Sequence, residues 1–292
     1  MKLSRRRALL GALAGASSAP LLPSRPADAV VIMDSTWRAE GFRPHIALAR
    51  QPQFAPLIAF SEDDGEEWDD ASGTWLGNFG GVGYVLTAGH CFKSGEPADQ
   101  YLYRTNSGEV REGTRLFMHP LYNGDGDTRS GYDVAIVALD DEVTDAGPPP
   151  LLYGGEVREG ERIVFVGFGS RGTGTKGEQS DFDEPLNNKT AAENTVDRIM
   201  MPVLPVPAED DAGNWLRITL RPDSDGGKRM DGILGGGDSG GSAWIQRGGR
   251  WLVVGVNVTG SGDKYGDHSY FTRLPGVRPW LNTILPGLRF TQ

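Results

Sequence analysis

The sequence predicts an all-β fold. Its 292 residues include 42 glycines and 19 prolines, which are spread between short apolar runs along the chain. Such frequent interruption of apolar runs by glycine and proline favours many strands joined by turns over long helices. The length suits one large domain, because all-β barrels of this size commonly form a single unit. No internal repeat is visible in the sequence.

The first 29 residues are predicted to be a signal peptide of the twin-arginine type. Arg5–Arg7 precede a mild apolar stretch from Leu9 to Ala19, and Ala27–Ala29 offer a small-x-small cleavage pattern. The apolar stretch is too short for a membrane anchor, which needs about 20 residues. The general secretory route is the alternative. We therefore expect a secreted or periplasmic protein that has no membrane attachment once the signal is removed.

The charge balance is acidic. The chain carries a net charge of −10, and removal of residues 1–29 leaves 24 basic and 38 acidic residues, a net charge of −14. Nucleic-acid binding requires a basic face, so this balance argues against a nucleic-acid partner.

Cys91 is the only cysteine, which excludes an intrachain disulfide. A domain of about 260 residues can rely on its hydrophobic core instead. Twin-arginine export delivers folded proteins and would suit such a chain. Cys91 is expected to be a small buried side chain, because it has no partner for redox or metal chemistry.

Three segments carry residues suited to nucleophilic catalysis. The run Gly237–Gly241 presents the Ser239 hydroxyl between glycines, and Leu86–Cys91 presents the His90 imidazole after an apolar run. Asp133 stands at the start of another apolar run. A serine is a poor nucleophile alone, so it needs a base within hydrogen-bond reach, and the base needs a third group to fix its tautomer. We expect these three side chains to meet.

The order His, Asp, Ser in these segments resembles the trypsin/chymotrypsin family of serine proteases, here a bacterial-type exported member. Further landmarks are Val166–Gly169, Gly255–Gly262 and Phe271–Leu274. The resemblance implies two six-stranded antiparallel β-barrels, with the active site between them and a short C-terminal helix. It divides a protease domain of residues 30–292 into a first barrel at about 30–145 and a second at about 150–285.

The resemblance also assigns roles. His90 would be the general base, Asp133 would orient its ring, and Ser239 would be the nucleophile. The backbone N–H groups of Gly237 and Ser239 would form the oxyanion hole. In the family, the acid before the serine, here Asp238, pairs with an α-amino group that processing releases.

Signal cleavage after Ala29 would expose Val30 as an apolar N-terminus for that pairing with Asp238. The longer spacing from Val30 to His90 than is usual in the family leaves this pairing open.

The primary specificity pocket is harder to align. The family's pocket floor, six positions before the serine, is Ile233, and Gly260 and Ser269 match its walls. An apolar floor would disfavour Lys and Arg in the substrate, because an unpaired buried cation is costly, so cleavage after apolar residues is expected. A local shift in alignment would instead place Asp231 in the pocket and favour basic residues. His268 gives a weaker case for an acidic substrate residue.

The elements of the first half follow in order. Residues 30–50 are expected to form an N-terminal strand and connector, and residues 54–60 the first core strand of a barrel. Residues 61–70 hold seven acids and are expected to be a solvated loop, with a calcium site as the alternative. Residues 123–127 resemble the opening of a calcium loop but lack its later glycine and glutamate, so an acidic turn is expected there.

In the second half, residues 145–150 are predicted to link the two barrels because they are rich in proline. Residues 170–195 are too polar to bury and are expected to form an enlarged surface loop beside the substrate cleft. Residues 277–285 place Trp280, Leu281 and Ile284 at helical spacing.

These observations favour an exported serine endopeptidase that works through an acyl-enzyme. We expect a monomer that acts on a protein or peptide substrate and needs no metal or other cofactor. The alternative is a binding module that has the protease fold but no catalytic activity. An α/β-hydrolase that cleaves esters is excluded, because those enzymes place the serine before the acid and the histidine.

Overall fold

The computed structural model describes residues 30–92, 97–122, 124, 131–179, 182, 189–201 and 213–291. The expected signal peptide and most of the acidic turn at 123–127 lie outside these residues. None of the helices in the described ranges has the length and hydropathy required to cross a bilayer.

The first barrel is closed by six antiparallel strands that follow one another around the ring. In ring order they are β2 (Leu57–Ser61), β3 (Ala71–Phe79), β4 (Val82–Thr87), β7 (Ala135–Leu139), β6 (Val110–Met118) and β5 (Leu102–Thr105). Phe60, Leu86 and Tyr103 are almost fully buried in its core. β7 is buried at every position, as expected for an uninterrupted run of apolar residues.

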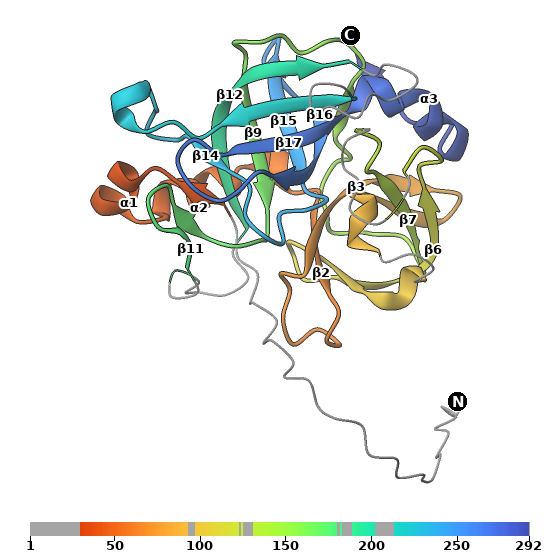
Figure 1. Cartoon of the computed structure of the whole chain (residues 1–292). Coiled ribbons are helices and arrows are strands. Elements are labelled where there is room, and N and C mark those ends of the chain that lie inside the picture. The colour runs from red at the N-terminus through yellow and green to blue at the C-terminus, as the bar shows by residue number, and fades with distance from the viewer. Residues whose placement is uncertain are drawn as a thin grey trace, which may run out of the picture.

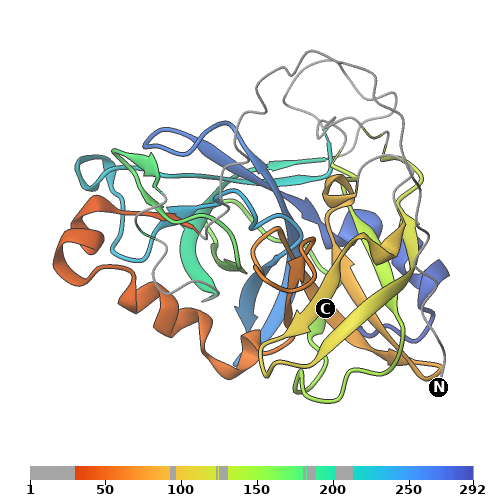
Figure 2. The same ribbon diagram turned by 90° about the horizontal axis from the view of Figure 1, so that it is seen from below.

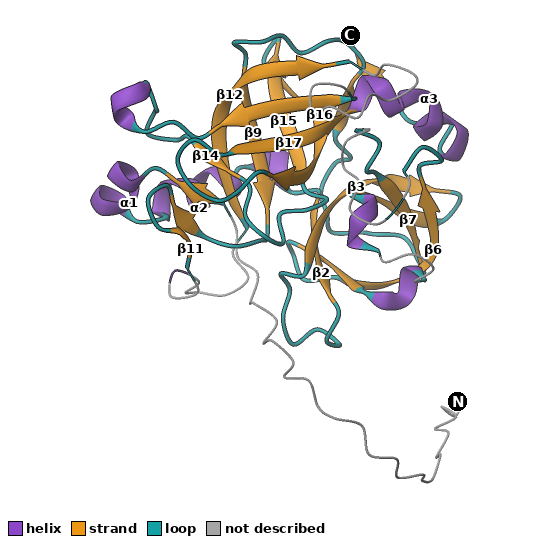
Figure 3. Cartoon of the chain, viewed as in Figure 1, coloured by secondary structure: helices purple, strands orange, loops and turns teal. Residues whose placement is uncertain are grey.

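The second barrel also has six antiparallel strands in its ring. They are β9 (Arg162–Gly167), β12 (Thr190–Met200), β13 (Trp215–Thr219), β17 (His268–Arg273), β16 (Arg250–Gly260) and β15 (Ser242–Arg247), which pairs again with β9. The short strands β8 (Leu151–Tyr153) and β18 (Phe290–Thr291) extend this sheet in parallel beside β16. The two barrels lie side by side, and strands make up most of the ribbon (Figures 1 and 3).

A helix follows the last barrel strand. α3 (Leu274–Ile284) buries Leu274, Val277 and Leu281, which lie three and four residues apart and so share one face. Two closed six-stranded antiparallel barrels with a short C-terminal helix confirm the predicted fold class.

The N-terminal segment differs from the expected connector. It begins with the strand β1 (Val31–Ile32), but α1 (Asp34–Glu40) and α2 (Arg43–Ala49) follow as two short helices. α2 buries His45, Leu48 and Ala49 and packs against β12. Both helices run along the edge of the molecule that carries the second barrel (Figure 2).

β1 is the centre of a small sheet that the sequence analysis missed. It pairs in parallel with β10 (Gly172–Thr173) and antiparallel with β14 (Gly232–Ile233), and β10 pairs with β11 (Gly177–Glu178). Part of the expected loop at 170–195 is therefore a hairpin. The sheet brings residues before the first barrel against the segment that precedes Ser239.

Four short 3₁₀ helices lie within the described ranges, at Pro52–Phe54, Gly89–Cys91, Ala98–Gln100 and Asp223–Asp225.

Candidate active site

His90 lies directly after strand β4, in the 3₁₀ turn Gly89–Cys91. Its side chain is 27% exposed, so one edge of the ring reaches the surface between the barrels. The apolar run of β4 is fixed in the barrel wall, and the imidazole projects from its end.

Asp133 holds the inner edge of that ring. Its Oδ2 lies 2.7 Å from His90 Nδ1, and its Oδ1 accepts the backbone N–H of His90 at 2.9 Å. The aspartate is fully buried, and its carbonyl oxygen accepts a hydrogen bond of 3.2 Å from the hydroxyl of Thr272 in β17. A carboxylate can only accept hydrogen bonds, so Nδ1 must carry the proton and Nε2 is left free to accept one.

Ser239, which belongs to the second barrel, completes a hydrogen-bonded row of three side chains with Asp133 and His90. Its Oγ lies 2.7 Å from His90 Nε2. The backbone carbonyl of Ser239 accepts the N–H of Ser72 in β3 at 2.8 Å, which ties the serine turn to the first barrel. The structure thus brings together the three side chains that the sequence analysis selected from distant segments.

The turn before Ser239 presents two backbone donors. Gly237 has a φ of +83°, a conformation that residues with a Cβ rarely adopt. Among the described residues, no hydrogen bond occupies the N–H of Gly237 or of Ser239. Within these residues, neither donor is therefore committed to another acceptor, as an oxyanion hole requires.

Asp238 points away from the cleft into the second barrel. Its carboxylate is completely buried and accepts the N–H groups of Val30, Gly169 and Gly235 at 3.0–3.1 Å. Burial raises the pKa of Asp238 to about 7. The structure therefore places Val30 beside Asp238, the two residues for which the sequence analysis left the pairing open.

Val30 has a strained backbone. It is fully buried, and its φ is +63°. A β-branched side chain in this region is a genuine outlier, which costs about 1–3 kcal/mol.

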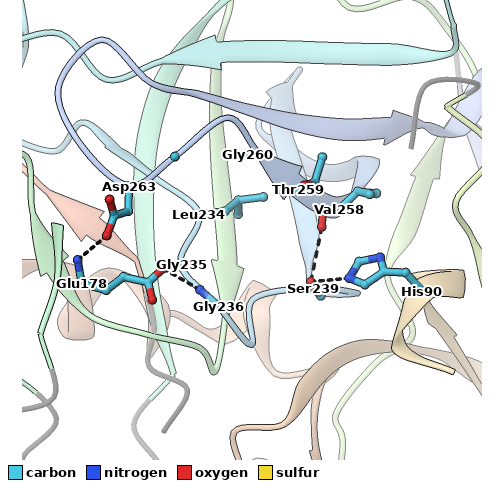
Figure 4. A pocket seen from close by; sticks show the side chains of 11 residues that line it. His90, Glu178, Leu234, Gly235, Gly236, Ser239, Val258, Thr259, Gly260 and Asp263 are labelled. Atoms are coloured by element: carbon cyan, nitrogen blue, oxygen red, sulfur yellow. Dashed lines mark hydrogen bonds between the residues drawn. The ribbon is translucent and has the colours of Figure 1, made fainter. Parts of the chain in front are cut away.

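A pocket of about 450 Å³ opens beside the Ser239–His90 pair (Figure 4). Its described lining consists of His90, Glu178, Leu234, Gly235, Gly236, Ser239, Val258, Thr259, Gly260, Gly262 and Asp263.

Of the three residues predicted to shape the specificity pocket, Gly260 is in this lining. Ile233 is fully buried in strand β14, opposite Val31. Ser269 is also buried, and its Oγ accepts the N–H of Leu234 at 2.9 Å. Ile233 and Ser269 are therefore buried near the pocket, but their side chains are not part of its described lining.

The two alternative specificity residues also lie outside the described lining. Asp231 forms an ion pair with Arg162 at 2.6 Å and accepts the N–H of Lys228. His268 Nδ1 is bonded to the hydroxyl of Thr219 at 2.8 Å. Their side chains are engaged elsewhere, so neither the shifted alignment nor the acidic preference gains support.

Two acids of the lining, Glu178 and Asp263, were not predicted from the sequence. Glu178 lies on β11, inside the stretch expected to be a surface loop, and Asp263 follows β16. No local pattern marks them, because the pairing of β10 with β1 is what carries the hairpin to the pocket.

The acidic loop at 61–70 is organised by its own backbone. Asp63 accepts the hydroxyl of Ser61 and the N–H of Glu67, and Asp70 accepts the N–H of Glu62. Within the described ranges, no group of three or more His, Cys, Asp or Glu side chains is arranged to hold a metal ion. Burial and the neighbouring Asp70 raise the pKa of Asp69 to about 7.

Cys91 is buried, and burial raises the pKa of its thiol to about 12. A thiol of this kind stays protonated and unreactive at neutral pH.

Comparison with known proteins agrees with this geometry. The model of the trypsin-like peptidase domain matches residues 71–256, a range that contains His90, Asp133 and Ser239. No curated protein matches the chain.

Proposed function

We propose that this chain, which belongs to the trypsin-like peptidase family, is an exported serine endopeptidase that hydrolyses peptide bonds through an acyl-enzyme. The observation that supports this most strongly is the hydrogen-bonded row from Asp133 through His90 to Ser239. Its two side-chain contacts are each 2.7 Å long, and a pocket able to take a substrate side chain adjoins it.

In the acylation step, Ser239 Oγ attacks the carbonyl carbon of the scissile bond, and His90 Nε2 takes the hydroxyl proton. The carbonyl oxygen becomes negatively charged and accepts the N–H groups of Gly237 and Ser239. Asp133 stays ionised and stabilises the imidazolium. As the C–N bond breaks, His90 returns the proton to the leaving amine.

In the second half of the reaction, a water molecule replaces the amine. His90 takes a proton from this water, whose oxygen attacks the acyl carbon. The ester bond to Ser239 then breaks, and the proton returns to Ser239 Oγ. The acid product leaves, and the resting arrangement is restored.

Activation would follow from signal removal. Cleavage after Ala29 would convert the Val30 amide into an ammonium group next to the Asp238 carboxylate, which is 3.1 Å away in the uncut chain. Val30 has a strained positive φ in the uncut chain, and without a preceding residue the cut N-terminus is no longer restricted in this way. The ammonium would give the buried Asp238 carboxylate a partner of opposite charge, and the release of backbone strain would favour the cut chain.

The rival proposal is a binding module that has the fold without the chemistry. Proteins of that kind usually lose a member of the triad, whereas His90, Asp133 and Ser239 are all present here.

Digestion of an unfolded protein such as reduced casein tests the proposal. Wild type and a control variant, Ser107→Ala, should release new peptides, and Ser239→Ala should release none. Ser107 is a suitable control because it is exposed, and its hydroxyl donates to the Asp145 carbonyl, its one side-chain hydrogen bond among the described residues. If no peptides are released by wild type that begins at Val30, the binding-module alternative is favoured.

A further inference from the structure

The pocket beside Ser239 is lined in large part by glycines. Gly235 and Gly236 form one side and Gly260 lies on the other, so no side chains from these positions fill the space. A volume of about 450 Å³ is within the range of small-ligand pockets. The side chain of the substrate residue before the cleaved bond lies next to the carbonyl that Ser239 attacks, so it is the side chain that would enter.

Two carboxylates lie at the end of the pocket away from Ser239 (Figure 4). Glu178 Oε1 accepts the N–H of Gly236 at 2.9 Å, and Asp263 Oδ2 accepts the N–H of Glu178 at 2.9 Å. Each carboxylate is therefore fixed by a backbone donor and keeps acceptor capacity for a ligand.

Gly177 allows this close arrangement. A Cβ at this position would lie only 2.3 Å from Asp263 Oδ2. The hairpin β10–β11 thus brings Glu178 and Asp263 to the same end of the pocket without a steric conflict.

The pocket has no positive group to balance these acids within the described lining. Apart from the glycines, the catalytic pair and the two acids, the lining consists of Leu234, Val258 and Thr259, which are all uncharged. Among the described residues, neither carboxylate forms an ion pair with an arginine or a lysine.

These charges discriminate between substrates. An acidic substrate side chain would be repelled by both carboxylates, and a large apolar one would remove water from them without replacing its hydrogen bonds. A lysine or arginine side chain can lay its methylene groups along Leu234 and Val258 and place its charged end at the carboxylates.

We propose that Glu178 and Asp263 are specificity-determining residues that select arginine or lysine immediately before the cleaved bond. This inference rests on the proposed function of Ser239. It differs from the expectation of an apolar preference, and it also differs from the alternative based on Asp231, because the acids come from β11 and from the loop after β16.

A set of peptide amides that differ only in the residue before the cleaved bond tests this inference. We expect kcat/KM for arginine and lysine to exceed that for citrulline, leucine, phenylalanine and glutamate by at least about tenfold. Glu178→Gln and Asp263→Asn keep an oxygen to accept the backbone N–H but remove the charge. Each should lower kcat/KM for arginine about 10- to 100-fold, a much larger loss than for citrulline, which carries no charge.

Glu142→Gln is the matched control, because it removes one negative charge from an exposed position of the first barrel outside the described pocket lining. It should leave the preference for arginine intact. Equal cleavage after arginine and citrulline, or an arginine preference that survives both pocket substitutions, would overturn the inference while leaving the proposed peptidase function in place.

A binding measurement separates the two proposals. The fluorescent aryl amidine p-aminobenzamidine should bind Ser239→Ala protein and should bind at least about tenfold more weakly when Glu178→Gln or Asp263→Asn is added. Binding without any turnover by wild type would support the pocket assignment and contradict the peptidase. Failure of the amidine to bind, together with normal peptide cleavage, would contradict the pocket assignment alone.

Discussion

At the scale of single residues, Asp133 decides how His90 can act. The carboxylate accepts the proton-bearing Nδ1 at 2.7 Å, which leaves Nε2 as the acceptor for the Ser239 hydroxyl. The same aspartate is fully buried, so water cannot take over its role. The orientation of one ring thus depends on one acid that lies just before β7.

Asp133→Asn should lower kcat by about 10⁴-fold, the loss known for this change in related triads. An amide nitrogen in place of Oδ2 can only donate, so it would stabilise the imidazole tautomer that has its proton on Nε2. That tautomer cannot accept the serine proton. Steady-state kinetics on a peptide amide, together with a circular dichroism spectrum to check the fold, measures the effect.

Asp140→Asn serves as the control, because Asp140 lies at the far end of the same apolar run and is exposed. It should keep near-normal kcat. A near-normal kcat in Asp133→Asn would show that another group orients His90.

The three residues of the row could be predicted because each stands in a short motif with its own local signature. The pocket residues could not be predicted in the same way. Counting back from Ser239 selects Ile233, whose side chain is buried behind the pocket. Glu178 reaches the pocket only through the pairing of β10 with β1, and no local sequence pattern encodes a contact between such distant segments.

At the scale of elements, β1 links the N-terminus to the active-site turn. Its residues pair with strands β10 and β14, and Val30 just before it contacts Asp238. The pKa of the buried Asp238, raised to about 7 in the uncut chain, makes this link sensitive to pH.

The sign of the effect follows from the direction of the shift. Because the folded-state pKa of Asp238 is raised above its unfolded value of 3.8, the unfolded chain loses this proton more readily. The free energy of unfolding of the uncut chain should therefore decrease as the pH rises from about 4 to about 7, by about 4 kcal/mol in total. In a chain that begins at Val30, the adjacent ammonium favours the ionised carboxylate and should reduce this loss.

Urea unfolding of both chains at several pH values between 4 and 8 measures the difference. Asp238→Asn in the uncut chain should remove the part of the pH dependence that comes from Asp238. Other carboxyls with a raised pKa, such as Asp69, contribute equally to both chains and should remain as a common background. Identical pH profiles for the uncut and cut chains would contradict the proposed pairing of Val30 with Asp238.

The helices α1 and α2 illustrate an element that sequence patterns do not reveal. Each has only seven residues, and helices this short depend on packing more than on their own propensity. Their buried positions include the polar Asp34, Thr36 and His45. An apolar periodicity was therefore missing, and a connector was the natural expectation.

At the scale of the whole molecule, the two barrels meet at the catalytic row. His90 and Asp133 come from the first barrel and Ser239 from the second, and a hydrogen bond from Thr272 to Asp133 crosses between them. No disulfide joins the barrels, because the chain has a single cysteine. The all-β class could be predicted from glycine and proline punctuation, whereas the barrels themselves were expected through the motif resemblance.

Export of the molecule is predicted to depend on the arginine pair. Replacing Arg5 and Arg6 together with lysine should retain the precursor in the cytoplasm, because Arg7 could restore a pair after a single change. Fractionation and immunoblotting would locate the protein. N-terminal sequencing of the exported form should give Val30 as its first residue. Normal export of the double variant would instead indicate the general secretory route.

The most direct test of the central claim is covalent labelling with a fluorophosphonate probe, followed by mass spectrometry of the peptides. An activated serine forms a stable phosphonyl ester, whereas an ordinary hydroxyl does not react. We expect one adduct, on Ser239, that is absent from His90→Ala protein. A folded chain beginning at Val30 that takes up no probe, or that carries the adduct on a different serine, would contradict the assignment of Ser239 as the nucleophile.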